Sequence, residues 1–324
     1  MVDVVALSLS SPEDHLRAWH ELNVTYWREE ISDVDPIGQR ESHADLESDA
    51  TMRRHALLGI DGGSFVGCAA YELPLLEDRD VAWVNIVVAP EHRRRGAGRE
   101  LLAALAEVVR ADGRTRLVGD APIGRPGEQF AAAVGARVTQ LDVGSVLDVA
   151  TTDRDQLMRL AEPHPGYRLV QWRDRCPDDL VDRYAVARTA MNDAPHGDEH
   201  HDDWDWDAAR VRELEQRRGR WQVRAYTTAA VHTDSGDVAG FTDLLIVDRP
   251  STAAQEDTGV LAQHRGHRLG LAIKAANLLV LREQEPRITR VMTWNAEENR
   301  HMRAVNEQLG FRVSTRWVDL SLKL

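Results

Sequence analysis

Residues 83–112 read WVNIVVAPEHRRRGAGRELLAALAEVVRAD, and they say more about the architecture than any other stretch of this chain. They predict a strand rich in β-branched residues, a turn at Pro90, a basic loop with two glycines, and an amphipathic helix that begins near Arg99. The first N–H groups of such a helix have no partner within it, and the helix dipole adds partial positive charge. Because the glycines admit an anion to the backbone and three arginines add charge, the stretch predicts a pyrophosphate-binding loop.

A second stretch repeats this pattern. Residues 255–285 read QEDTGVLAQHRGHRLGLAIKAANLLVLREQE, and placing Arg265 on Arg93 also places Gly270 on Gly98. The offset is about 170 residues, half of the chain, which indicates a duplicated domain rather than a short repeat. We therefore expect two domains, 1–155 and 166–324, joined by a segment rich in proline, glycine and charge.

The first loop resembles the acyl-CoA pyrophosphate loop of the GNAT acyltransferase family, Arg/Gln-x-x-Gly-x-Gly/Ala, which Arg93, Gly96 and Gly98 fill. The halves also end alike, with FAAAVGAR at 130–137 and NEQLGFR at 306–312, both similar to the family segment Tyr-Glu-x-Leu-Gly-Phe. The resemblance implies an α/β (α+β) fold: two tandem GNAT-like domains, each a twisted, mostly antiparallel mixed sheet flanked by helices.

The resemblance also implies acetyl-CoA, or another acyl-CoA, as co-substrate. In the second loop Arg268 stands where the first has Gly96, and its side chain either caps the pyrophosphate or obstructs the site. Asn299 holds the family position that contacts the pantetheine arm. The residues expected at the coenzyme are Ile86, Val87, Val88, Arg93, Arg94, Arg95, Gly96, Ala97, Gly98 and Arg99 in the first half, and Thr258, Val260, Leu261, Arg265, Gly266, His267, Arg268, Leu269, Gly270 and Asn299 in the second.

The chemistry that follows is attack of an amine on a thioester. Backbone N–H groups near Val88 or Val260 would hold the oxyanion, and a base would remove the amine proton. The candidate bases are Glu256 and Asp257, just ahead of a predicted strand, and Glu72 on the strand before the first loop.

The tyrosine that serves the family as general acid is replaced in both halves. The family uses a tyrosine at the start of its Tyr-Glu-x-Leu-Gly-Phe segment, where this chain has Ala131 and Asn306. Neither donates a proton as a phenol does, but a thiolate of pKa ~8.5 leaves without strong help.

An acidic loop over residues 191–206 is the candidate acceptor site of the second half. Its carboxylates would favour a cation such as a protonated amine, unless they only form a solvated surface; they are Asp193, Asp198, Glu199, Asp202 and Asp203. Three histidines share the loop without a cysteine, and we predict no metal at His196, His200 and His201. The acidic loop and Asn299 favour the second half for catalysis.

Composition narrows the function further. A formal net charge of −13 disfavours a nucleic-acid partner, and Cys68 and Cys176 lie far apart, which suggests a reduced, cytoplasmic protein without a signal peptide or membrane span. We expect an acyl-CoA-dependent N-acyltransferase acting on the amine of a small molecule, as a monomer or homodimer. The alternatives are a peptide or protein N-acetyltransferase and a non-catalytic acyl-CoA-binding regulatory module.

Overall fold

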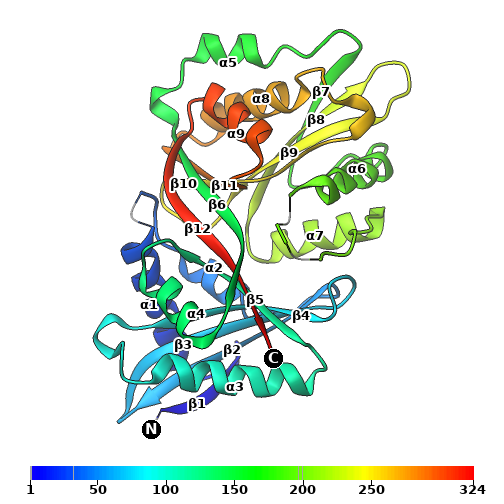
Figure 1. The fold of residues 1–324 in the computed structure, drawn as a ribbon. Helices are drawn as coiled ribbons and strands as arrows, with labels where there is room; N and C mark the ends of the chain where they lie inside the picture. The colour runs from blue at the N-terminus through cyan, green and yellow to red at the C-terminus, as the bar shows by residue number, and fades with distance from the viewer. Residues whose placement is uncertain (1, 32, 196, 199) are drawn as a thin grey trace. The chain divides into compact units, whose positions relative to one another are not determined.

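The computed structural model describes residues 2–31, 33–195, 197–198 and 200–324 (Figure 1). The chain forms two compact units. Unit 1 consists of Met1–Asp142, His196–Asp202 and Thr315–Leu324, and unit 2 consists of Val143–Pro195 and Asp203–Ser314.

Each compact unit is made of segments that are separated in the sequence, so a single boundary between residues 155 and 166 does not divide them. The last ten residues of the chain belong to unit 1, and residues 143–155 belong to unit 2. We still propose that the two copies of the duplicated sequence are 1–155 and 166–324. The limits of a sequence repeat need not coincide with those of a compact unit.

The sheet of unit 1 is mostly antiparallel, with β4 and β5 as its parallel pair. Its strands, in spatial order, are β1 (Asp3–Leu7), β2 (Met52–Asp61), β3 (Ser64–Pro74), β4 (Val81–Val88), β5 (Arg116–Pro122) and β12 (Arg312–Lys323). The pairing of β12 with β5 runs from Trp317 opposite Pro122 to Lys323 opposite Arg116. The final strand of the chain therefore extends the sheet of the first unit.

Helices cover both faces of this sheet, because neighbouring strand residues point to opposite sides. On one face Leu58 and Cys68 pack in a cluster with Trp19 of α1 (Glu13–Glu30), which also contacts α2 (Gln39–Ala44). On the other face Leu57 and Ala69 pack in a cluster with Leu101 of α3 (Ala97–Ala111). Helix α4 (Pro126–Val134) follows β5.

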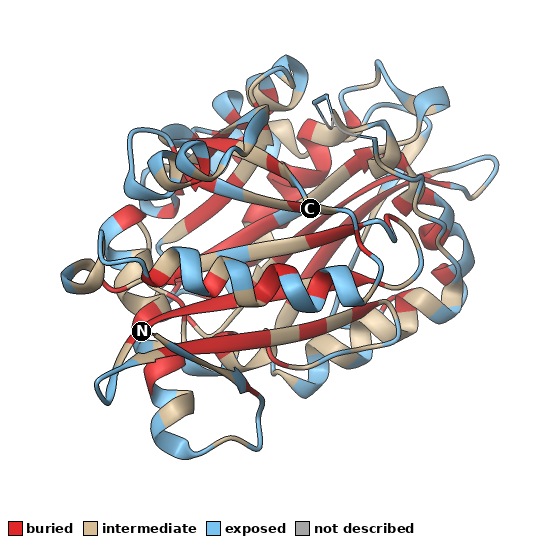
Figure 2. Ribbon diagram, turned by 60° about the horizontal axis from the view of Figure 1, so that its bottom comes forward, coloured by how far each residue is buried: buried red, intermediate tan, exposed pale blue. Residues whose placement is uncertain are grey.

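Unit 2 repeats this arrangement. Its strands, in spatial order, are β6 (Arg137–Asp148), β11 (Arg290–Ala296), β10 (Thr252–Val260), β9 (Val238–Ile246), β8 (Arg224–His232) and β7 (Tyr167–Arg173). Its helices are α5 (Arg154–Leu160), α6 (Val181–Arg188), α7 (Ala208–Arg220), α8 (Leu269–Gln284) and α9 (Arg300–Gln308). Buried residues concentrate on the strands, and the outward turns of the helices are exposed (Figure 2).

The segment expected to be a plain linker contains helix α5. Asp153 caps this helix by accepting from the N–H of Asp155, and Leu157 is buried in the core of unit 2. A helix of seven residues gives too short a periodic pattern to be recognised between prolines and glycines.

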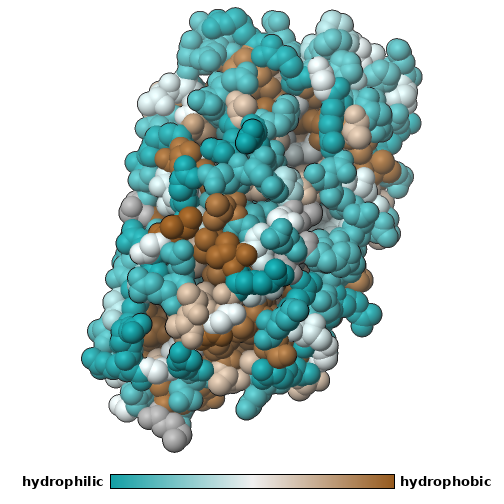
Figure 3. Space-filling model, viewed as in Figure 1, coloured by the Kyte–Doolittle hydropathy of each residue, from teal (hydrophilic) through white to brown (hydrophobic). Residues whose placement is uncertain are grey.

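One face of the chain can be judged for its polarity. The face of Figure 3 is mostly hydrophilic, with apolar atoms gathered in smaller areas. None of the helices in the described part of the chain is long and apolar enough to cross a membrane.

Candidate functional site

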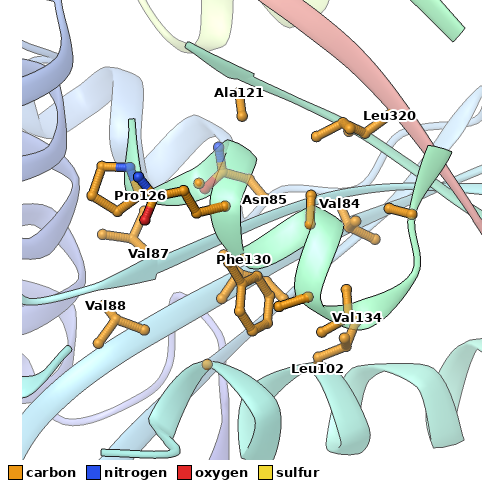
Figure 4. A pocket seen from close by; sticks show the side chains of 18 of the residues that line it. Val84, Asn85, Val87, Val88, Leu102, Ala121, Pro126, Phe130, Val134 and Leu320 are labelled. Atoms are coloured by element: carbon orange, nitrogen blue, oxygen red, sulfur yellow. The ribbon is translucent and has the colours of Figure 1, made fainter. Parts of the chain in front are cut away.

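A cavity of about 680 Å³ opens in unit 1 where β4 and β5 separate (Figure 4). The two strands pair only from Val81 opposite Arg116 to Trp83 opposite Val118. Beyond that point β4 and β5 line opposite sides of the cavity, and residues of α1, α3, α4 and β12 also line it. Its apolar walls include Val84, Ile86, Val87, Val88, Leu102, Phe130, Leu320 and Leu322.

The predicted pyrophosphate loop lies on this cavity. Helix α3 begins after Gly96, whose φ of 96° is in the left-handed region, and Arg94 has a φ of 64°. At Gly98 an added Cβ would come within 3.2 Å of the Phe130 ring, so glycine permits this close approach. Every residue predicted at the coenzyme in the first half lines the cavity except Arg95.

Arg93 braces the loop. Its Nε donates to the carbonyl oxygen of Val88 at 3.1 Å, and its Nη2 donates to Glu29 of α1 at 2.9 Å. These bonds tie the loop to the end of β4 and to α1. Arg94 has no ion pair within the described residues, so its charge is available to a ligand.

The loop of unit 2 is built in the same way. The Nε of Arg265 donates to the carbonyl of Val260 at 3.0 Å, and its Nη2 donates to Asp193. Gly266 has a φ of 85° and Arg268 a φ of 57°. Each loop therefore has two left-handed positions and a glycine at only one of them, and Arg268 adopts this backbone at a cost of about 1 kcal/mol.

In unit 2, side-chain contacts join the positions that correspond to the cavity lining of unit 1. The N–H of Arg116 donates to the carbonyl of the residue before β4, and the N–H of Arg290 donates to the carbonyl of the residue before β10. These two arginines are therefore equivalent, and counting five residues on from each aligns Ala121 with Asn295. Gly135 after α4 and Gly310 after α9 are likewise equivalent, and counting four residues back from each aligns Ala131 with Asn306. Ala121 and Ala131 line the cavity of unit 1, whereas Asn306 Nδ2 donates to Asn295 Oδ1 at 2.7 Å.

A second pair joins corresponding positions of unit 2. The loop alignment places Lys274 where unit 1 has Leu102, and the alignment of the glycines after α4 and α9 places Phe311 where unit 1 has Ala136. Both residues of unit 2 are buried, and the Lys274 ammonium lies 5.6 Å from the centre of the Phe311 ring. In unit 1 the aligned residues, Leu102 and Ala136, line the open cavity instead.

Asn299 has a structural task. Its side-chain oxygen accepts from the N–H of Met302 at 3.1 Å and so caps helix α9. That oxygen therefore has a partner within the chain, which the family pattern does not reveal.

The three carboxylates predicted as bases lie in different surroundings. Glu72 is 3.4 Å from Arg54 Nε, and Asp257 is 2.6 Å from Arg188 Nη2, so both are in ion pairs. Glu256 lies in an irregularity of β10, where protein atoms surround it closely although its side chain remains accessible. Desolvation and then the charge of Asp257 raise its pKa to about 7. None of the three lines the described cavity of unit 1.

The sequence gives no sign of a buried ionic network in unit 2. Arg188 donates to Asp243 at 3.1 Å and stacks on Trp206 with its guanidinium carbon 4.1 Å from the ring centre. Asp243 is fully buried and also accepts from Thr227 at 2.7 Å. Because its members come from α6, β8, β9 and β10, we assign this network to the stability of unit 2.

The sequence analysis assigned the acidic loop to the second half, but the stretch 196–202 of this loop belongs to unit 1. Asp202 and Asp78 each accept from the other's backbone N–H at 2.8 Å, both within unit 1. His201 Nδ1 is 3.4 Å from Asp78. His196 and Glu199 lie outside the described residues. Among those described, no three His, Cys, Asp or Glu residues are grouped as metal ligands would be.

Two units of this topology, with a helix-start loop at the end of a strand in each, have the architecture of a tandem GNAT protein. Residues 16–122 match the Acetyltransferase (GNAT) family, a range that includes β4, the loop and β5. The chain therefore contains a GNAT domain, and its similarity to known proteins is that of an acetyltransferase of this type.

Two relatives match nearly the whole chain. Mycothiol acetyltransferase of Salinispora tropica is 28% identical over 306 residues, which cover 89% of this chain and 91% of the relative. A solved tandem GNAT protein from the clavulanic acid biosynthesis pathway is 29% identical, with a TM-score of 0.82 over 100% of this chain and 98% of its own. A GCN5-related N-acetyltransferase from Sphaerobacter thermophilus shares the fold at 14% identity, with a TM-score of 0.70 over 99% and 95% of the two chains.

Proposed function

We propose that this acetyltransferase uses acetyl-CoA to acylate the amine of a small molecule, and that the coenzyme binds in the cavity of unit 1. One observation carries the proposal: residues predicted at the coenzyme from the loop pattern line one cavity in the folded chain. The cavity volume of about 680 Å³ is within the usual range for small-molecule sites. The relative named mycothiol acetyltransferase supports a small acceptor.

The loop and strand supply the two things that the reaction needs. The free N–H groups at the start of α3, with the charge of Arg94, suit a pyrophosphate. The end of β4 no longer pairs with β5, so backbone groups near Val88 are placed to hold an oxyanion. The apolar walls between them suit the less polar pantetheine arm.

The experiment is a thiol-release assay. The protein is mixed with acetyl-CoA and a panel of primary amines, including amino sugars, diamines and a peptide with a free N-terminus. The masses of the products are then measured by mass spectrometry. We expect release of thiol together with a mass gain of one acetyl group on a small amine. Acetylation of the peptide alone would instead support a peptide N-acetyltransferase, and coenzyme binding without thiol release would support a regulatory module.

A further inference from the structure

Three carboxylates stand on neighbouring strands of unit 1. Asp120 of β5 lies directly opposite Asp319 of β12, and Asp142 lies on β6, the next strand in the order. Gln140 Nε2 donates to Asp142 at 2.9 Å and to Asp319 at 3.3 Å. Like charges directly opposite each other in a sheet are destabilising. Within the described residues no lysine or arginine forms an ion pair with these three, which we call the carboxylate row.

The carboxylate row reaches the coenzyme cavity at Asp120. Asp120 lines the cavity: protein atoms surround its carboxylate closely, but the side chain remains accessible from the cavity, so a ligand can reach it. Tyr26 and Glu30 of α1 line the same cavity. Acidic groups from two sides of unit 1 therefore meet where β4 and β5 have separated.

Glu30 gives a second, independent sign of a ligand. Its side chain is only 6% exposed, and its buried Oε2 accepts no hydrogen bond from any described residue. The nearest cations are Arg125, with Nε 3.4 Å from Oε2, and Arg93, with Nη2 3.9 Å from Oε1. A buried carboxylate oxygen without a donor is costly, so a donor from a bound molecule would stabilise it.

The electrostatics of the region point the same way. Desolvation and then the charge of Asp142 raise the pKa of Asp120 to about 6. Desolvation, then Asp142 and Asp120, raise the pKa of Asp319 to about 7, against a lowering effect of His201. Desolvation also raises the pKa of Asp142. A cation bound among these groups would oppose all three shifts.

We propose that Asp120, Asp319 and Glu30 form the acceptor site of unit 1, and that its substrates are primary amines that arrive as cations. This inference rests on the proposed function. Asp120 takes one proton from the ammonium, and the freed nitrogen lone pair forms the C–N bond with the acyl carbon. The C–S bond then breaks with its electron pair on sulfur, and the second nitrogen proton passes to the thiolate. The first proton leaves Asp120 to solvent, and Asp319, paired with Asp120 across the strands, adds negative charge that holds the ammonium.

The test compares Asp120→Asn with wild type, using the amine of the panel that reacts fastest. We expect kcat/KM for the amine to fall about 100-fold, as for loss of a general base, with the Kd for acetyl-CoA unchanged. Asp319→Asn should mainly raise KM for the amine. Asp3→Asn, on an exposed carboxylate of β1, is the matched control and should change neither constant.

The pH dependence of kcat/KM distinguishes a base from a residue with a purely structural role, because only the loss of a base would change its shape. The base must be deprotonated, so wild-type kcat/KM should rise with pH through a pKa of about 6, and Asp120→Asn should lose this rise. The charged and titratable groups around Asp120 are Tyr26, Glu30, Asp142, Asp319 and His201.

Three results would overturn the inference while leaving the proposed function intact. These are an unchanged kcat/KM and pH profile in Asp120→Asn, a loss of acetyl-CoA binding in that variant, and a loss of turnover in Glu256→Gln instead. Failure of the proposed function would look different, because wild type would then release no thiol with any amine.

Discussion

At the scale of single residues, the arginine that begins each phosphate-loop pattern is part of the loop's own structure. Arg93 and Arg265 make the same bond to the carbonyl at the end of the preceding strand, and each also binds a carboxylate. An arginine whose donors are already occupied has less to offer a phosphate. Its fixed place in the pattern is explained by the shape that it gives to the backbone.

Replacing Arg93 should therefore affect stability as well as binding. In Arg93→Met we expect the free energy of unfolding to fall by about 1 kcal/mol, because partly exposed charged hydrogen bonds are lost, and acetyl-CoA affinity to fall about tenfold. In Arg94→Met only the affinity should fall. Thermal unfolding and calorimetric titration measure the two effects, and an unchanged melting temperature in Arg93→Met would contradict the bracing role.

Lys274 is a buried cation with an aromatic ring as its neighbour and is only 1% exposed. Desolvation lowers its pKa from 10.5 to about 7. The unfolded chain holds the proton up to a pH of about 10, so between pH 7 and 10 the unfolded state binds more protons. The free energy of unfolding should therefore rise with pH in this window.

Lys274→Met should remove that pH dependence. Met has a similar length and no charge, so we also expect it to stabilise the protein at pH 7 by on the order of 2 kcal/mol. Urea unfolding at pH 7 and 9.5 measures both effects, with the exposed Lys323→Met as the matched control. If the free energy of unfolding changed by the same amount between pH 7 and 9.5 in wild type and in Lys274→Met, the Lys274 ammonium would not be desolvated in the folded state.

The sequence was informative about residues whose role depends on local spacing. The loop pattern predicted the cavity-lining Val88, Gly96 and Gly98, because turn, glycine and helix start are set within a few residues. It did not reveal Asp120 beside Asp319. Those positions are about 200 residues apart, and only the strand register brings them together.

At the scale of elements, β12 is the least expected part of the proposed coenzyme site. The sequence predicted a strand at the end of the chain, but alternation cannot tell which edge it joins. In the structure β12 pairs with β5, and Leu320 and Leu322 line the cavity of unit 1. The cavity that we propose for the coenzyme is thus incomplete without β12.

A bulky residue on β12 should then impair acetyl-CoA binding. We expect Leu320→Trp to weaken binding at least tenfold, because the indole would occupy the cavity, with the sheet retained by its backbone bonds. Lys323→Ala, exposed on the same strand, should bind as wild type. Circular dichroism checks the fold, and full affinity in Leu320→Trp would contradict the assignment of β12 to the cavity wall.

At the scale of the whole molecule, duplication has produced two units with the same loop geometry and different crevices. Small residues leave the crevice of unit 1 open, whereas Asn295 and Asn306 bond across that of unit 2. The sequence predicted the duplication and the fold of both units. It did not predict which unit is open, because that depends on side chains from β11, α8 and α9 meeting in space.

The measurement that tests this account most directly is calorimetric titration of acetyl-CoA into wild type, Gly98→Trp and Gly270→Trp. The two glycines hold equivalent places in the two loops and have ordinary backbone angles. We expect one site per chain in wild type, loss of that site in Gly98→Trp, and full binding in Gly270→Trp. Binding that survives in Gly98→Trp but disappears in Gly270→Trp would place the coenzyme in unit 2 and contradict the account.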